Sequence, residues 1–331
     1  MTCCDLACWV CFDGSFGVSS CLDFRIILSV PLWVMSDRDW KAYNAALVRR
    51  GEILLDLRVM RGWKDELADM NKGKEGGRYE YPGSFIRLLA FIHVYLRLPY
   101  RQLEGFTRML SKHTGGLKAP DYSSMAWRIQ RLNVKLNDDL AGSMEEVVLA
   151  LDASGIKVSN RGEWMRHKWK VRRGFLKIHI AVDVKSKRIL AMEITKEHVA
   201  DGRRLKSLVK EASKHVKITK AIGDGGYDSK TNFQYLAMKG IEPVIKVRKN
   251  ASSKAGGCMP HKLVAQEYLR NPQAWKRKHG YGQRWMVETV FSTFKRLFGE
   301  YTSSIRFRHM VKEMMLKASL YNIFTAISPG I

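Results

Sequence analysis

The order of strand and helix patterns between residues 144 and 247 limits the possible folds of this chain more than any other sequence feature. An apolar run comes first. Two segments in which apolar and polar residues alternate follow it, joined by a short polar turn, and alternation of this kind predicts half-buried strands. Helical spacing then alternates with two further strand patterns. The expected strands are 147–151, 175–184, 188–195, 218–223 and 241–247, and the expected helices are 201–214 and 229–239.

Three strands before the first helix exclude a doubly wound dinucleotide-binding fold, in which strands and helices alternate from the start. The order is that of a ribonuclease-H-like mixed sheet, so we expect an α/β fold with such a core over 144–331. Two helices, at 281–297 and 311–327, complete this domain. The polar and basic stretch 249–280 contains two prolines and a glycine pair, which predicts an insertion or mobile loop.

Residues 35–143 carry helical patterns alone, so we expect an all-α domain there. Its four helical segments are 39–57, 85–96, 101–110 and 122–132. The glycine-rich stretch 71–83 predicts a loop between the first two. The last two helices and their glycine-containing connection resemble a helix-turn-helix DNA-binding module, in which Arg128 and Arg131 would contact DNA. A plain helical bundle is the alternative.

The strong positive charge of the chain favours polyanionic partners. The chain has 57 Lys and Arg against 32 Asp and Glu, a formal net charge of +25, and 46% hydrophobic residues. That hydrophobic content is typical of a globular protein and excludes a disordered polycation. Nucleic acid and an anionic membrane surface are the candidate partners. No apolar run approaches the roughly 20 residues that cross a bilayer, so we expect no membrane partner. A basic chain with a single cysteine after residue 21 is expected to be cytoplasmic and nucleoid-associated.

Five of the six cysteines lie within the first 21 residues. One interpretation is a zinc or redox site built on Cys8 and Cys11, but it lacks a second spaced pair and a nearby histidine. We favour the interpretation that residues 1–34 are a non-native or misassigned N-terminal extension. Met35 fits a natural start because Ser36, directly after it, can cap a helix.

Two aspartates stand where an apolar strand pattern ends. Asp152 follows the run 147–151, and Asp224 follows the run 218–223. In open α/β sheets the carboxyl ends of the strands carry the site. A carboxylate there is costly to bury unless it is paired or bound to a metal. Taken alone, either aspartate fits a turn or a helix cap better than a functional site.

A third acid lies on a polar stripe of the helix expected at 281–297. Four residues fall within roughly 60° of one another on a helix that turns about 100° per residue, namely Tyr281, Arg284, Glu288 and Lys295. The stripe presents a carboxylate flanked by two cations and a phenol. The plainer alternative is an i, i+4 pair of Arg284 and Glu288 on a solvated face, which leaves the other two residues unexplained.

Residues 281–295, YGQRWMVETVFSTFK, resemble the Tyr-x2-Arg-x3-Glu-x6-Lys signature of DDE transposases from bacterial and archaeal insertion sequences, in the insertion-sequence-four/five group. Three other segments are similar in the same order, LDAS at 151–154, KIHIAVDV at 177–184 and GDGGYDS at 223–229. The resemblance covers residues 36–327. It has one departure within that range, because Ala-Ser at 153–154 replaces a more usual Ser-Thr pair.

The resemblance implies a catalytic triad of Asp152, Asp224 and Glu288. Converging carboxylates repel one another, and hard oxygen ligands without clustered His or Cys favour Mg²⁺ or Mn²⁺, with two ions expected. The implied function is that of a transposase, which binds the terminal inverted repeats of its insertion sequence, nicks the DNA with water and joins the freed 3′-hydroxyl to target DNA. Pairing two ends implies a homodimer on double-stranded DNA.

Further residues are expected to contact the DNA. We assign Arg284 and Lys295 to phosphates, and Tyr281 and Tyr227 to positioning a phosphate or a flipped base. The segment 157–177 adds cations and two tryptophans, which suit phosphate contacts and base stacking unless the segment is a solvated face. Its candidate DNA contacts are Arg166, Lys168, Arg172 and Arg173.

Two histidines and two rival functions complete the predictions. His179 and His198 are expected to be structural or positioning residues and not metal ligands. A ribonuclease-H-like nuclease or resolvase would cut without joining, and a decayed copy would keep DNA binding alone. The signature helix and the N-terminal helices favour a transposase over the first alternative, and the three intact acids favour it over the second.

Overall fold

The computed structural model describes residues 39–327, apart from 115–116, 138–139, 141–144, 159–174 and 253–255. Residues 41–331 form one compact unit. The predictions for residues 1–34 lie outside the described residues, as do the candidate DNA contacts Arg166, Lys168, Arg172 and Arg173.

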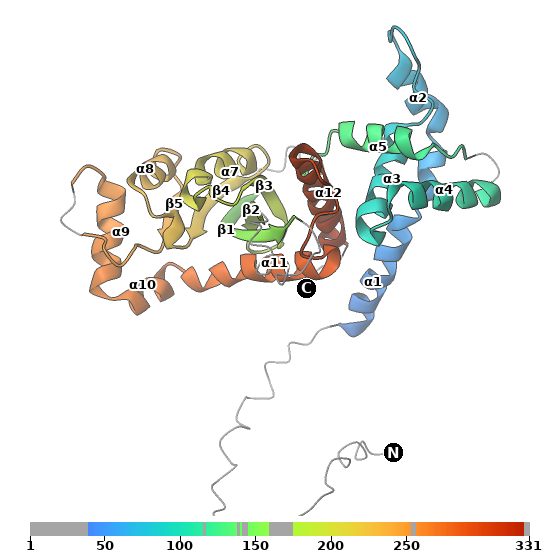
Figure 1. Ribbon diagram of the computed structural model, residues 1–331. Coiled ribbons are helices and arrows are strands. Elements are labelled where there is room, and N and C mark those ends of the chain that lie inside the picture. The colour runs from blue at the N-terminus through green and yellow to red at the C-terminus, as the bar shows by residue number, and fades with distance from the viewer. Residues whose placement is uncertain are drawn as a thin grey trace, which may run out of the picture. The chain divides into compact units, whose positions relative to one another are not determined.

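A five-stranded mixed sheet lies at the centre of this unit, with the strand order β3-β2-β1-β4-β5 (Figure 1). The strands are β1 (Glu146–Lys157), β2 (Phe175–Asp183), β3 (Ile189–Lys196), β4 (Lys217–Gly223) and β5 (Glu242–Ile245). β2 runs antiparallel to β1 and β3, whereas β4 runs parallel to both β1 and β5. Three antiparallel strands followed by two parallel ones confirm the predicted α/β fold with a ribonuclease-H-like mixed sheet.

β1 continues past the end that its apolar run predicts. Its parallel ladder with β4 ends at the pair of Ala150 and Ile222, but its antiparallel ladder with β2 continues to Lys157 and Phe175. Asp152 therefore lies within β1, two residues beyond the last pair with β4, and not after the end of the strand. The sequence does not predict the extension because it contains Asp, Ser and Gly, and its strand conformation depends on the partner strand.

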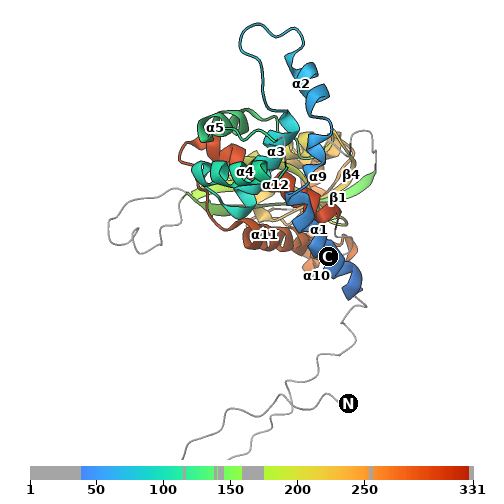
Figure 2. The same ribbon diagram turned by 90° about the vertical axis from the view of Figure 1, so that its right-hand side faces the viewer.

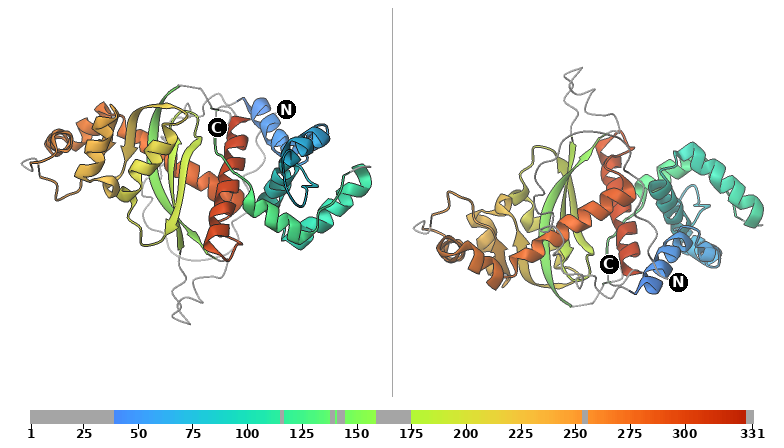
Figure 3. Two further views of the ribbon diagram at one scale, coloured as in Figure 1. Left: turned by 90° about the horizontal axis from the view of Figure 1, so that it is seen from above. Right: turned by 90° about the horizontal axis from the view of Figure 1, so that it is seen from below.

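Helices cover both faces of the sheet (Figure 1). One face packs against α7 (Leu205–Ala212) and α8 (Lys230–Met238), and the other against α11 (Trp285–Phe298) and α12 (Phe307–Ala326). Figure 3 shows α11 crossing the strands on the side seen from below. The 3₁₀ turns η4 (Asp201–Arg203), η5 (Gly225–Tyr227) and η6 (Tyr281–Arg284) precede α7, α8 and α11. None of the described helices is long and apolar enough to span a membrane.

The alternation of side chains along β1 decides which helix layer each residue meets. Leu149 and Leu151 belong to the core against α7 and α8. Ala150 and Ile156 belong to the core against α11 and α12. Because successive strand residues point to opposite faces, Asp152 lies on the α11 side of the sheet.

The N-terminal region is all-α, as predicted. Its elements are α1 (Trp40–Leu54), η2 (Leu57–Met60), α2 (Trp63–Asn71), α3 (Gly83–Leu96), α4 (Tyr100–Thr114) and α5 (Tyr122–Arg131). α3 lies beside α12 (Figure 2). Most side chains of α3 are buried, and Phe85 and Leu89 of α3 share one hydrophobic core with Leu320 of α12. Because the helices and the sheet share this core, the domain boundary at residue 143 stays a prediction.

The stretch 249–280 contains two helices and is not the loop that its composition predicts. They are α9 (Met259–Arg270) and α10 (Pro272–Lys278). Pro260 and Pro272 stand in the first turns of these helices, where a missing N–H removes no helical hydrogen bond. The Asn271 side chain caps α10, and Trp275 is buried in a small core with Ile222 of β4. The prolines therefore mark helix starts.

Candidate active site

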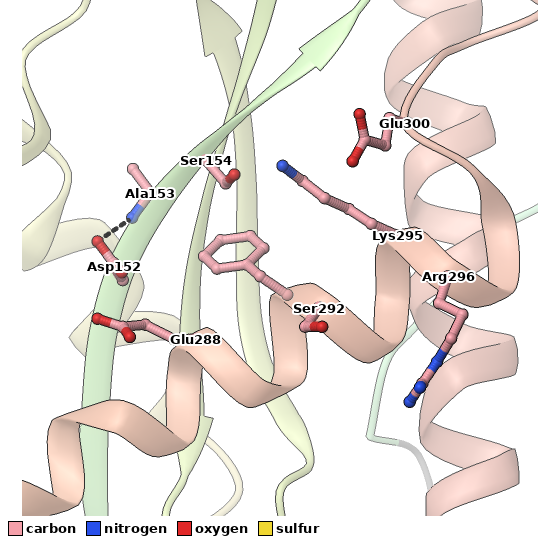
Figure 4. A pocket seen from close by; sticks show the side chains of 9 residues that line it. Asp152, Ala153, Ser154, Glu288, Ser292, Lys295, Arg296 and Glu300 are labelled. Atoms are coloured by element: carbon pink, nitrogen blue, oxygen red, sulfur yellow. Dashed lines mark hydrogen bonds between the residues drawn. The ribbon is translucent and has the colours of Figure 1, made fainter. Parts of the chain in front are cut away.

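Asp152 of β1 and Glu288 of α11 line one polar hollow (Figure 4). Asp152 is largely buried, and its Oδ1 accepts a hydrogen bond from the Ala153 N–H at 2.8 Å. Glu288 lies in the first turn of α11, where the helix end stabilises negative charge. The other polar residues of the hollow are Ser154, Ser292, Lys295, Arg296 and Glu300. Lys295 and Arg296 place two cations beside the carboxylates of this hollow, and such cations suit a phosphate-containing ligand.

Arg284 bridges the two carboxylates. Its Nη1 lies 3.6 Å from Asp152 Oδ2, and its Nη2 donates a hydrogen bond to Glu288. Burial lowers the pKa of Arg284, but Tyr281 and the two carboxylates raise it more, so the pKa lies above its ordinary value. The guanidinium therefore stays charged and offsets the repulsion between the carboxylates.

The polar stripe spans two kinds of helix. Tyr281 and Arg284 lie on the 3₁₀ turn η6, and α11 begins only at Trp285. Gly280 precedes the turn with φ of 66°, in the left-handed region that favours glycine. The predicted single regular helix is therefore wrong at its start, although Arg284 still contacts Glu288 as an i, i+4 pair.

Asp224 approaches the same arginine from the end of β4. It caps η5, with its Oδ1 accepting the Gly226 N–H at 2.9 Å. It lines a second hollow together with Tyr281 and Arg284. Three cations that follow β5 line the same hollow, namely Lys246, Arg248 and Lys249. Arg284 thus contacts two of the three predicted acids and shares a hollow with the third.

The three carboxylates interact electrostatically. Burial raises the pKa of Asp152 above its ordinary value, and the negative charges of Asp224 and Glu288 raise it further. The Ala153 N–H and Arg284 oppose this shift without cancelling it. Within the described part of the chain, no three His, Cys, Asp or Glu side chains are arranged as a ready-made metal cluster. The fold therefore brings the acids into adjacent hollows without closing them into one cluster.

Most of the chain matches models of one protein family. A family model described as Transposase DDE domain matches residues 143–323, and a second model with the same description matches residues 48–161. The first match alone covers more than half of the chain. The chain belongs to the transposase DDE domain family.

Two solved structures of transposases are similar to this chain at a low level. The piggyBac transposase synaptic complex with hairpin DNA has 12% identity and a TM-score of 0.39, over 85% of this chain and 74% of that chain. The Drosophila P element transposase strand transfer complex has 13% identity and a TM-score of 0.29, over 57% of this chain and 42% of that chain. This chain therefore spans less than half of the P element protein. The family assignment rests on the family models alone.

The two tyrosines predicted to position DNA differ in exposure in this transposase DDE domain. Tyr281 is partly buried, its ring lies 5.6 Å from that of Trp275, and burial raises its pKa to about 12. Its phenol therefore stays protonated. Tyr227 has no exposed surface, because the turn after Asp224 folds its ring back under Gly223 into the α7–α8 core. A direct DNA contact from Tyr227 does not fit this burial.

Arg128 and Arg131 lie in different surroundings on α5. Arg128 donates to the Tyr81 carbonyl at 3.0 Å and lies 4.5 Å from the centre of the Tyr79 ring, so it ties α5 to the segment before α3. Arg131 is exposed and lies 3.9 Å from the centre of the Trp127 ring, which is itself 50% exposed. Arg131 and Trp127 present a cation and an aromatic face to solvent, a combination that suits nucleic acid. The helix-turn-helix interpretation stays a prediction.

Sequence reasoning missed the three cations beside Asp224. Lys246 lies at the end of the strand expected at 241–247, and Arg248 and Lys249 follow that strand. The carboxyl ends of parallel strands meet at one edge of a sheet. Their position at the end of a predicted strand could therefore have identified them as residues near Asp224. Arg248 is fixed there, because its Nε donates to the Gly225 carbonyl at 3.0 Å.

Proposed function

We propose that this protein is the transposase of an insertion sequence in the insertion-sequence-four/five group, and that it cuts DNA at the ends of its element and joins them to target DNA. One observation carries the proposal. Asp152, Asp224 and Glu288 come from β1, β4 and α11, and all three lie around Arg284. Membership of the transposase DDE domain family supports the reaction, and the Tyr-Arg-Glu-Lys spacing supports the subgroup.

The donor set fits Mg²⁺ or Mn²⁺. The residues that line the two hollows offer carboxylates and hydroxyls but neither His nor Cys. Such hard oxygen donors favour these ions over zinc. We expect Asp152, Asp224 and Glu288 to hold two ions, which when bound stabilise the charge on the attacking and leaving oxygens.

Cations on both sides of the carboxylates would hold the DNA strand. Lys295 and Arg296 line the hollow of Asp152 and Glu288, and Lys246 and Lys249 line the hollow of Asp224. Phosphates bound on both flanks would place the reacting phosphodiester beside the acids. With the phosphodiester positioned in this way, no covalent enzyme intermediate is needed. Tyr281 would therefore act as a hydrogen-bond donor and not as a nucleophile.

The reaction has two displacements at phosphorus. In the first, water attacks and the bond from phosphorus to the 3′-oxygen breaks, which leaves a 3′-hydroxyl on the element and a 5′-phosphate on the flank. In the second, this 3′-hydroxyl attacks a phosphodiester of the target, and the target's own bond from phosphorus to its 3′-oxygen breaks. Arg284 and Lys295 would bind the non-bridging oxygens in both steps.

Cleavage of DNA that carries the inverted repeats flanking the gene tests the triad. Asp152→Asn, Asp224→Asn and Glu288→Gln should each abolish Mg²⁺-dependent cleavage and leave DNA binding intact. Glu300→Gln is the matched control, because Glu300 lines the same hollow but lies outside the triad. Unchanged cleavage by Asp224→Asn would contradict the proposal. Loss of DNA affinity instead of turnover in Glu288→Gln would contradict the assignment of that residue.

We also propose how the DNA is bound. The helical region 35–143 would bind the terminal inverted repeats, and two chains would act together because two ends must be paired. Light scattering on the protein with repeat DNA should show two chains in each complex that holds two ends. A complex with a single chain at saturating DNA would contradict this part of the proposal.

A further inference from the structure

A polar cluster with two fully buried members lies behind the proposed active site, on the α7–α8 side of the sheet. Lys177 and His179 come from β2, Asp201 from η4 and Tyr227 from η5. Asp201 Oδ1 lies 2.6 Å from Lys177 Nζ and 3.4 Å from His179 Nδ1, and His179 Nε2 lies 2.9 Å from the Thr195 hydroxyl oxygen. The side chains of His179 and Tyr227 have no exposed surface.

The cluster costs free energy of folding, and the proposed cleavage and joining steps do not use it. Neither His179 Nδ1 nor the Tyr227 hydroxyl has a hydrogen-bond partner among the described residues. Buried polar atoms without such partners cost free energy, so an apolar cluster of the same shape would be more stable. The polar residues therefore call for a role other than stability.

The cluster is joined to Asp224 by a close contact between two backbone segments. A methyl group on Gly202 would lie 2.8 Å from the Gly226 carbonyl oxygen, so the two turns touch and leave no space for a side chain. The Asn232 side chain holds them together, since its Nδ2 donates to the Gly202 and Tyr227 carbonyls, both at 2.9 Å.

Gly226 in turn holds the Asp224 carboxylate. Its N–H donates to Asp224 Oδ1, and a methyl group on Gly226 would lie 2.9 Å from that oxygen and 3.6 Å from Asp201 Oδ2. The two carboxylates thus flank one glycine. Lys177 neutralises Asp201, so the Asp201 carboxylate adds no unpaired negative charge behind the site.

We propose that Asp201, held by Lys177, is a positioning residue that sets the Asp224 carboxylate for binding the same divalent ion as Asp152. This inference rests on the proposed function. Asp201 contacts neither DNA nor ion. It acts through the contact between Gly202 and Gly226. Residues that orient metal ligands in this way typically change metal affinity by about 10- to 100-fold when replaced.

The test is Mn²⁺ binding by the full-length protein, measured from the electron paramagnetic resonance signal of free Mn²⁺. Asp201→Asn should weaken binding by about tenfold or more. Gly202→Ala, which changes no charge but must displace Gly226, should weaken it in the same direction. Glu145→Gln, which removes an exposed pair with Lys185 near the same sheet, should leave it unchanged. Circular dichroism and melting temperature identify the variants that fold, so that affinity is compared among folded proteins only.

Asp224→Asn is the reference that separates the two proposals. If Asp224→Asn binds Mn²⁺ like the wild type, the proposed metal site itself is wrong. If Asp224→Asn weakens binding while Asp201→Asn and Gly202→Ala bind like the wild type, the positioning role is overturned and the proposed function stands. Should Asp201→Asn not fold, wild-type affinity in Gly202→Ala alone overturns the inference.

Discussion

Lys317→Met should destabilise the protein far more than the loss of a surface ion pair does. Lys317 and Glu313 on α12 form an ion pair of 2.8 Å between side chains that are only 4% and 6% exposed. Glu313 also accepts the N–H groups of Ser303 and Ser304, and Lys317 donates to the Tyr301 carbonyl at 3.2 Å. The pair therefore fixes the segment that follows α11, the helix of Glu288 and Lys295.

The magnitude follows from the burial of the pair. Removing one partner of a buried ion pair costs about 3–5 kcal/mol, because the other charge is left in a medium of low dielectric constant. Burial raises the pKa of Glu313, but Lys317 and the N–H donors outweigh burial and the pKa is lowered. A lowered carboxyl pKa means that this stability is present above the unfolded value of about 4.5 and is lost as pH falls below it. The measurement therefore belongs at pH 7.

Denaturant unfolding at pH 7, followed by circular dichroism, measures the difference. Lys317→Met should lose about 3–5 kcal/mol of unfolding free energy. Lys214→Met is the control, because its pair with Glu211 is 56% and 52% exposed and should be worth only about 0–1 kcal/mol. Replacing Glu313 and Lys317 together by methionine should restore part of the loss, because no charge is then buried alone, although the Ser303 and Ser304 N–H groups lose their acceptor. A loss below about 1 kcal/mol in Lys317→Met would show that the buried pair contributes no more to stability than a surface ion pair.

Three further predictions concern DNA binding and pH. Lys295→Gln and Lys249→Gln should each weaken DNA binding, measured by fluorescence anisotropy. Each should also reduce the slope of log affinity against log salt concentration by about 1. An unchanged slope would exclude a phosphate contact by that lysine. Burial lowers the pKa of His179 to about 4. As pH falls below about 6.5, this histidine therefore binds a proton in the unfolded chain before it does so in the folded protein. About 3 kcal/mol of unfolding free energy should be lost by pH 4. His179→Gln should flatten the pH dependence of unfolding, and an unaltered profile would count against this. Arg128→Gln should lower the melting temperature, whereas Arg131→Gln should lower DNA affinity alone, and the reverse pattern would contradict their placement.

The sheet and the three acids could be predicted because their signals are local. Each strand has its own alternation or apolar run, and the strand order then follows from simple topology. Asp152 and Asp224 each come directly after such a run, and Glu288 has Arg284 one turn before it. Periodicity and spacing located the strands and these three acids in the sequence, and the resemblance to DDE transposases supplied the catalytic role that we propose for the acids.

The features that sequence reasoning missed depend on contacts between distant segments. β1 extends to Lys157 only because β2 pairs with it there. Pro260 and Pro272 predict a loop in isolation, but each occupies the first turn of a helix whose partners lie on the sheet. Tyr227 looks like an exposed residue of a glycine-rich turn, yet the turn buries it completely.

The site electrostatics were also beyond prediction from the sequence. The spacing of Arg284 and Glu288 predicts a pair on one helix, but nothing local shows that Asp152 lies 3.6 Å from the same guanidinium. The close contact between Gly202 and Gly226 was equally hidden, because the two glycines are 24 residues apart in sequence.

Strand joining distinguishes a transposase from a nuclease that only cuts DNA. A labelled duplex that carries the flanking inverted repeat and a free 3′-hydroxyl is incubated with a plasmid, Mg²⁺ and the full-length protein. We expect labelled plasmid with the wild type and with Glu300→Gln, and none with Asp224→Asn. Cleavage of repeat DNA without any joining by the wild type would contradict this expectation in favour of a nuclease, and so would joining by Asp224→Asn at the wild-type rate.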